Sequence, residues 1–155
     1  AQDIGVSYGE AKEYMDAYFA RFRGVRDYQK EAVRRAKALG YAETLFHRRR
    51  YLPELNVPAL RAFGERVARN MPIQGTAADV IKLAMVHVDQ RLRAEGMKAK
   101  LILQVHDELI VECPEAEREK AVQVLREEME HAVAYTVPLT ADAGWGRNWA
   151  EAHGT

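Results

Sequence analysis

The sequence has few of the features that mark secreted, membrane or strongly charged proteins. It contains one cysteine, Cys113, which excludes an internal disulfide and fits a reducing, cytoplasmic compartment. No apolar run is long enough to span a membrane, and the N-terminus has no signal-peptide pattern. Acidic and basic residues cancel, 23 against 23, so any binding of nucleic acid must depend on local clusters of basic side chains.

The remaining composition is that of a globular domain. The 155 residues are 48% apolar and 30% charged, which suits one domain or a substantial piece of a larger one. The chain begins at Ala1 rather than at methionine, which is consistent with a fragment, a processed chain or a trimmed chain. We find no internal repeat and no low-complexity linker, so the sequence gives no reason to divide the chain into two domains.

Two helices are expected in the first forty residues. Ser7 and Glu10 have the spacing of a capping box, which predicts a helix that begins there and ends near residue 22. A second helix is expected over residues 25–39. Gly40 can end it, because glycine readily adopts the left-handed conformation found after a helix C-terminus.

The middle of the chain alternates irregular and helical patterns. Residues 44–53 are expected to be β-type or irregular, and Pro58 is placed to open a third helix at its first turn. Pro72 should kink or break that helix, because its ring removes a backbone hydrogen bond. Apolar spacing then predicts a helix over residues 76–95 that ends at Gly96.

The last third of the chain predicts a mixed α and β structure. We expect a hairpin over residues 100–113, a helix over 115–134 and a final strand over 139–143. Trp145 and Trp149 are expected to serve as core residues or C-terminal anchors. The predicted fold class is therefore α+β, with helices packed on a small antiparallel sheet.

The strongest signal for chemistry lies at the centre of the predicted hairpin. Residues 104–108 read Gln-Val-His-Asp-Glu, so that His106, Asp107 and Glu108 separate two apolar, β-rich runs. A strand–turn–strand holds such acids rigidly at a surface, where a carboxylate can bind Mg²⁺. Two other interpretations stay open, a solvated turn and the His-Asp metal site of a phosphohydrolase. The phosphohydrolase would need further ligands, and the other histidines have no metal-binding spacing.

A second group of polar residues lies upstream. Arg66, Asn70 and Gln74 are spaced at i, i+4 and i+8, so they would share one helix face if the kink at Pro72 is mild. The alternative is a solvated helix face with salt bridges, such as one from Glu65 to Arg69.

The sharpest basic cluster of the chain is a run of three arginines, extended by a fourth. Arg48, Arg49 and Arg50 are consecutive, Tyr51 follows them, and Arg61 lies further along the chain. Such a run is either a solvated loop or a site for nucleic-acid phosphates, and a neighbouring aromatic residue slightly favours the second.

A glycine and three small residues begin the helix expected near residue 76. Residues 75–78 read Gly-Thr-Ala-Ala, and free N–H groups at a helix start can bind phosphate. Small residues also permit close helix packing, and we favour packing here.

Taken together, residues 66–79 and 104–108 resemble the C-terminal part of the bacterial family A DNA polymerases of the DNA polymerase I type. In that family the Gln-Val-His-Asp-Glu sequence is called motif C and lies in the palm. The similarity extends over nearly the whole chain, as far as Trp149. The resemblance implies that residues 1–60 form fingers-side helices and a basic loop, and that residues 61–155 form part of the palm.

The resemblance also implies roles for individual residues. Asp107 matches the metal-binding aspartate, Glu108 an accessory acid, and His106 a residue near the primer end. Arg66, Asn70 and Gln74 match residues that contact primer–template DNA, and the segment with Arg48, Arg49, Arg50 and Arg61 lies near the DNA channel. Donors in the minor groove can sense base-pair geometry without reading sequence, because the acceptors there are nearly shared by all correct pairs.

The expected activity is transfer of dNTPs to a primer 3′-hydroxyl with two Mg²⁺ ions, in DNA replication and repair. The family's other essential carboxylate lies upstream of the matched region, so the isolated chain is expected to be inactive. The expected partners are primer–template DNA, dNTPs and the missing upstream polymerase region. The alternative function is a non-catalytic DNA-binding module or one subunit of a split polymerase.

Overall fold

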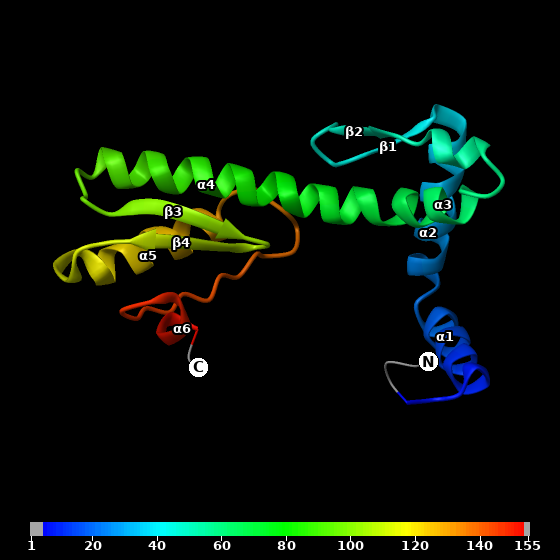
Figure 1. Ribbon diagram of the computed structural model, residues 1–155, viewed down its shortest axis with the longest axis horizontal. Helices are drawn as coiled ribbons and strands as arrows, with labels where there is room; N and C mark the ends of the chain where they lie inside the picture. Colours follow the sequence, from blue (N-terminus) through cyan, green and yellow to red (C-terminus); the bar gives the residue numbers. More distant parts are fainter. Residues whose placement is uncertain (1–4, 154–155) are drawn as a thin grey trace. The chain divides into compact units, whose positions relative to one another are not determined.

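A computed structural model describes residues 5–153 and divides the chain into two compact units, Ala1–Gly75 and Thr76–Thr155. Both units combine helices with one two-stranded antiparallel sheet, as Figure 1 shows, which confirms the α+β class. The expected fingers and palm portions, with a boundary near residue 60, stay a prediction.

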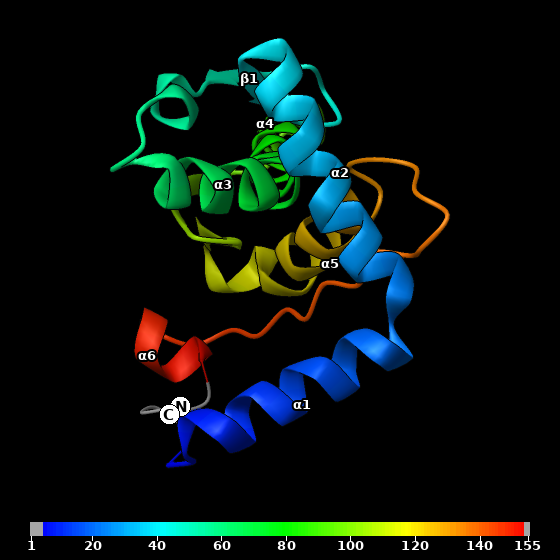
Figure 2. The ribbon, with the colours of Figure 1, turned by 90° about the vertical axis from the view of Figure 1, so that its right-hand side faces the viewer.

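The first unit is mainly helical. Its elements are α1 (Tyr8–Arg21), α2 (Arg23–Leu39), β1 (Tyr41–Glu43), β2 (Arg49–Tyr51), the 3₁₀ turn η2 (Pro53–Asn56), α3 (Arg61–Asn70) and the π-helical turn η3 (Met71–Gly75). The capping box at Ser7 is confirmed, and Gly40 ends α2 with a φ of 77°. The chain changes direction between α1 and α2 (Figure 2), and Phe22 is both the C-cap of α1 and the N-cap of α2.

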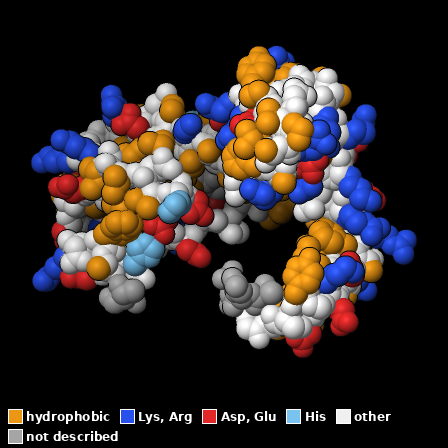
Figure 3. Space-filling model, turned by 45° about the vertical axis from the view of Figure 1, so that its right-hand side comes forward, with side chains coloured by type: hydrophobic (Ala, Val, Ile, Leu, Met, Phe, Trp, Pro, Cys, Tyr) orange, Lys and Arg blue, Asp and Glu red, His pale blue; other side chains and the backbone are white. Residues whose placement is uncertain are grey.

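The core of the first unit lies where α2, the β1–β2 hairpin, η2 and α3 meet. Its buried members are Val33, Ala36, Ala42, Leu52, Leu55 and Ala68. Helix α1 has no buried residue, and apolar side chains such as Tyr14 and Phe22 stay exposed. Figure 3 shows such apolar side chains beside basic ones on the surface.

Pro58 and Pro72 affect the helices next to them in different ways. Pro58 does not open α3, because residues 58–60 form a turn and the helix begins at Arg61. This prediction was wrong. The residues just before Pro58 form the 3₁₀ turn η2 and its C-cap, Val57. At Pro72 the α-helix is interrupted, but helical turns continue as η3. A π-helical turn is wider than an α turn, so it can accommodate a residue that lacks an N–H group.

The second unit packs one hairpin against two helices. Its elements are α4 (Thr76–Ala94), β3 (Lys100–Val105), β4 (Glu108–Glu112), the 3₁₀ turn η4 (Glu115–Glu117), α5 (Arg118–Glu130) and the short α6 (Trp149–Ala152). Its core consists of Val88, Leu92, Ala99, Ala121 and Val124. The expected helix end at Gly96 and the expected hairpin are both confirmed.

Two expectations for the C-terminal part were wrong. The helix expected over residues 115–134 begins as a 3₁₀ turn and ends at Glu130. The strand expected over 139–143 is absent from the described chain, which has no regular structure there. A strand needs a hydrogen-bonded neighbour, and the N–H of Ala141 instead donates to Oε1 of Glu130 at 3.0 Å.

Candidate functional site

The tip of the β3–β4 hairpin is a two-residue turn. Val105 pairs with Glu108, which leaves His106 and Asp107 as the loop. His106 has a φ of 53°, so its backbone occupies a left-handed region that non-glycine residues seldom adopt. A positive φ at the first loop residue is shared by the type I′ and type II′ turns of two-residue hairpins, whose twist matches that of the strands. The side-chain amide of Gln104 donates to the carbonyl of His106 at 2.6 Å and helps to hold this turn.

The two acids at this tip have different surroundings. Asp107 is exposed and makes no hydrogen bond or ion pair with the described residues. Glu108 is half-buried, and its Oε2 lies 3.0 Å from Nε2 of His153. The sequence does not predict this partner, because His153 lies in no metal-binding pattern and nothing in its neighbours indicates a contact with the hairpin.

The hairpin tip provides part of a cation site. Within residues 5–153 no group of three or more His, Cys, Asp or Glu side chains could hold a metal ion together. The exposed carboxylate of Asp107 suits Mg²⁺, which prefers oxygen ligands and usually retains water and substrate phosphates. The described residues therefore offer Asp107, with Glu108 beside it, and the remaining ligands would have to be supplied from elsewhere. The phosphohydrolase interpretation gains no support from them.

The second candidate region is a groove in the first unit, of about 450 Å³. Arg66 and Asn70 reach it from α3, and Gln74 reaches it from the π-helical turn η3. Arg50 joins them from β2. Four residues with hydrogen-bond donors thus line one concave surface beside Phe63 and Met71. The spacing expected from the sequence is compatible with this geometry, and their role in DNA binding stays a prediction.

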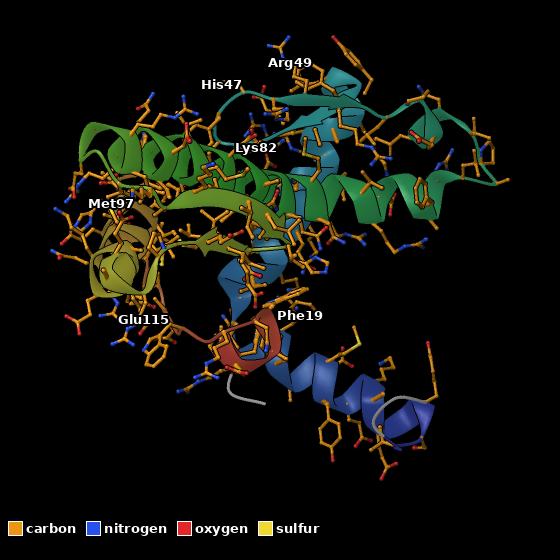
Figure 4. The ribbon with its side chains drawn as sticks, turned by 60° about the vertical axis from the view of Figure 1, so that its left-hand side comes forward. Phe19, His47, Arg49, Lys82, Met97 and Glu115 are labelled. Carbon is orange, nitrogen blue, oxygen red and sulfur yellow. The ribbon has the colours of Figure 1, made fainter. Side chains whose placement is uncertain are left out.

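The structure separates the consecutive arginines. Arg49 lies at the β1–β2 hairpin, as Figure 4 shows, where its Nε is 3.5 Å from Oε2 of Glu43 and its guanidinium lies 4.6 Å from the ring centre of Tyr41. Arg50 is the next residue, and successive side chains of a strand point to opposite faces. It lines the groove, whereas Arg48 and Arg61 do not. The sequence alone did not distinguish among these arginines.

Gly75 permits close packing at the end of the groove. A Cβ at this position would lie 2.7 Å from Cγ2 of Thr44 and 2.7 Å from Sδ of Met71. Thr44 is buried, and its Oγ1 accepts the N–H groups of Phe46 and Arg48 within the β1–β2 connection. This arrangement agrees with the interpretation of Gly75 as a packing residue.

The outer side of α3 carries an ion-pair cluster. Lys37 of α2 lies 2.6 Å from Glu65, and Arg69 lies 3.3 Å from it, so the expected Glu65–Arg69 pair is present. The hydrogen bond from Lys37 is the main cause that lowers the pKa of Glu65. Neither Glu65 nor Arg69 lines the groove. A salt-bridged side and a groove side therefore coexist on the same helix.

The two tryptophans are more exposed than a core residue would be. Trp145 is 58% and Trp149 46% exposed, so the core alternative was wrong for both. Trp145 stacks under the guanidinium of Arg118, with 3.9 Å between Cζ and the ring centre. Such a contact is typical of an anchor at the protein surface.

Known proteins provide an independent comparison. A family model described as DNA polymerase family A matches residues 1–151. DNA polymerase I of Streptococcus pneumoniae (strain TIGR4) is 46% identical over 154 residues, which cover 98% of this chain and 18% of that protein. DNA polymerase I of Mycobacterium tuberculosis (strain H37Rv) is 48% identical over 156 residues, which cover 99% of this chain and 17% of that protein. The chain thus spans less than a fifth of these relatives.

A solved structure is similar over the same range. The POL domain of Pol1 from M. smegmatis, in complex with a DNA primer-template and dNTP, has a TM-score of 0.93 and 46% sequence identity. The match covers 99% of this chain and 27% of that one.

Proposed function

This chain belongs to DNA polymerase family A, and we propose that it acts as part of a longer DNA-directed DNA polymerase. The single observation that carries this proposal is the hairpin tip, where an exposed carboxylate is held on a turn that its own strands and Gln104 support. In the proposed reaction a primer 3′-hydroxyl attacks the α-phosphate of a dNTP and pyrophosphate leaves.

The residues of this chain have separate tasks in that reaction. Asp107 would hold a divalent cation, Mg²⁺ in our proposal, and Glu108 would act as an accessory acid beside it. The pair of cations bound in the complete site would stabilise the attacking and leaving oxygens. His106 would lie near the primer end.

The groove donors would hold the primer–template. Arg66, Asn70 and Gln74 would donate to minor-groove acceptors, and Arg50 would pair with a backbone phosphate. Donors of this kind position DNA without selecting a base sequence, as a replication and repair polymerase requires. Arg48, Arg49 and Arg61 would contribute only to the positive charge near the DNA, since they lie outside the groove.

The cellular setting follows from the same proposal. No helix within residues 5–153 is long and apolar enough to cross a membrane. We place the complete polymerase in the cytoplasm, where genomic DNA and dNTPs are available.

A second candidate function rests on the incomplete cation site. Because the described residues offer Asp107 without a cluster of further ligands, the chain could act as a non-catalytic DNA-binding module or as one subunit of a split polymerase.

One experiment separates these functions. The purified 155-residue chain should incorporate no dNTP on a primed template, and joining it to an upstream polymerase region should restore Mg²⁺-dependent extension. A convenient form is a chimera in which this chain replaces the matching segment of M. tuberculosis DNA polymerase I. Extension by the isolated chain would contradict the proposal, and an inactive but folded chimera that still binds primer–template would favour the non-catalytic module.

A further inference from the structure

The contact between His153 and Glu108 is a feature of the hairpin tip that the proposed function leaves unexplained. It joins residues 45 positions apart, with 3.0 Å between Nε2 and Oε2. A carboxylate can only accept a hydrogen bond, so Nε2 must carry the proton in this contact. No described residue donates a hydrogen bond to Oε1, the second oxygen of Glu108.

The backbone before His153 is folded so that α6 is held in place. A Cβ on Gly144 would lie 2.5 Å from the carbonyl oxygen of Ala152, and one on Gly146 would lie 2.5 Å from Cβ of Glu151. The two glycines therefore let α6 pack directly on the preceding loop. Asn148 caps the helix by accepting the N–H of Glu151 at 3.0 Å.

The same loop is attached to α5. Trp145 stacks under Arg118, the first residue of α5, and Arg118 is itself 2.6 Å from Glu115. On α6, the ring of Trp149 lies 5.9 Å from the ring of His153. The position of the His153 imidazole is thus fixed by several contacts of α6 and its preceding loop, and not only by its contact with the hairpin.

We propose that His153 is a positioning residue that fixes the carboxylate of Glu108 beside Asp107. A glutamate at a turn samples several rotamers, and one hydrogen bond to a held donor restricts them. Oε1 then stays free for the cation or for its water ligands. This inference rests on the proposed function for the role of Glu108, but the contact itself can be tested without catalysis.

The first test uses the 155-residue chain as it stands. In ¹⁵N NMR spectra, Glu108→Gln should change the imidazole nitrogen shifts of His153, because the charged acceptor is removed. The shifts of His131 should stay the same, since that ring bonds to the carbonyl of Glu127 on another part of the unit. Unchanged His153 shifts would overturn the contact and the inference with it.

The second test uses extension kinetics of the chimera. His153→Ala should lower kcat about fivefold, because the coupling energy between two side chains in direct contact typically corresponds to a change of that size. KM for dNTP and primer–template should not change. His153→Gln should restore most of the loss, since its amide can donate from a similar position. His131→Ala is the matched control and should retain full activity.

A double variant gives the decisive comparison. On a Glu108→Gln background, His153→Ala should cause little further loss, because its only proposed task is to hold that carboxylate. An additive loss, or a change confined to KM for primer–template, would overturn the positioning role and indicate a direct contact with DNA. If the unsubstituted chimera extends no primer, the proposed function fails and the positioning role fails with it, whereas the NMR result still decides whether the contact exists.

Discussion

The groove of the first unit and the hairpin tip of the second unit present polar groups in opposite ways. Hydrogen-bond donors from three elements line the groove. The residues around Gly75 are packed so tightly that a side chain there would have no space. The hairpin tip instead exposes one carboxylate, that of Asp107, on a two-residue turn. A surface that must match the shape of a long partner needs many fixed groups, whereas a cation ligand needs a single carboxylate at a rigid position. The two regions should therefore respond differently to substitution.

The largest effect is expected at the hairpin tip. In the chimera, Asp107→Asn should lower kcat by about 1,000-fold, because a metal ligand contributes several kcal/mol to the transition state. Affinity for primer–template should stay within a few fold, since the substitution leaves the donors that line the groove unchanged. Glu112→Gln, at the other end of β4, is the control and should have little effect. Substantial activity in the Asp107→Asn variant would show that Asp107 is not essential to catalysis and would contradict the role proposed for the hairpin tip.

The next effect tests whether the groove reads DNA. Gln74→Ala should weaken use of the primer–template by about 1–3 kcal/mol, with little dependence on base sequence. The measurement is extension from a primer that ends in 3-deazaguanine, which lacks the minor-groove nitrogen acceptor. The unsubstituted chimera should lose activity on this primer and Gln74→Ala should lose less. Equal losses would show that Gln74 does not contact that acceptor.

A substitution in the packing behind the groove should change the free energy of unfolding rather than the rate of the reaction. Gly75→Ala should lower the free energy of unfolding by about 1–3 kcal/mol, because the added Cβ meets the short, buried side chain of Thr44. Gly24→Ala is the matched control, since a Cβ there meets nothing within 4 Å and α2 should gain slightly in stability. Thermal unfolding of the 155-residue chain gives both values, and equal results would contradict the close packing.

Neighbouring arginines provide a sharper test of the groove. Arg50→Ala should weaken primer–template binding and reduce the slope of its salt dependence by about one, if Arg50 neutralises a phosphate. Arg49→Ala should leave that slope unchanged, because Arg49 is engaged by Glu43 and Tyr41. Binding titrations at several salt concentrations compare the two, and the reverse pattern would assign the phosphate contact to Arg49.

The smallest effect concerns the salt-bridged side of α3. The pKa of Glu65 lies below its ordinary value of 4.5, mainly because of the Lys37 hydrogen bond. A lowered pKa means that the stabilisation is complete above that ordinary value and is lost as the pH falls through the folded-state pKa. The difference in Tm between the unsubstituted chain and Glu65→Gln should therefore shrink below about pH 4.5. On a Lys37→Met background that pH dependence should be weaker, and an unchanged dependence would contradict the assigned cause.

Local sequence patterns predicted most of the elements. The capping box at Ser7, the left-handed Gly40 and Gly96, and the hairpin around Asp107 all depend on residues close in the chain, so their physics is readable from spacing alone. Local spacing could not predict that Pro58 lies in a turn before α3, or that residues 139–143 do not form a strand. Whether extended chain becomes a strand depends on a neighbour for its N–H groups, and here Glu130 is the acceptor for Ala141.

The sequence by itself determined the family, the carboxylate at the hairpin turn and the helical spacing of Arg66, Asn70 and Gln74. Only the tertiary structure decided that Arg50 rather than Arg49 joins those donors, because the choice depends on which face of β2 lines the groove. It also decided the pairing of His153 with Glu108. Side chains distant in sequence meet through packing and loop closure, and no local pattern of residue types encodes such a contact.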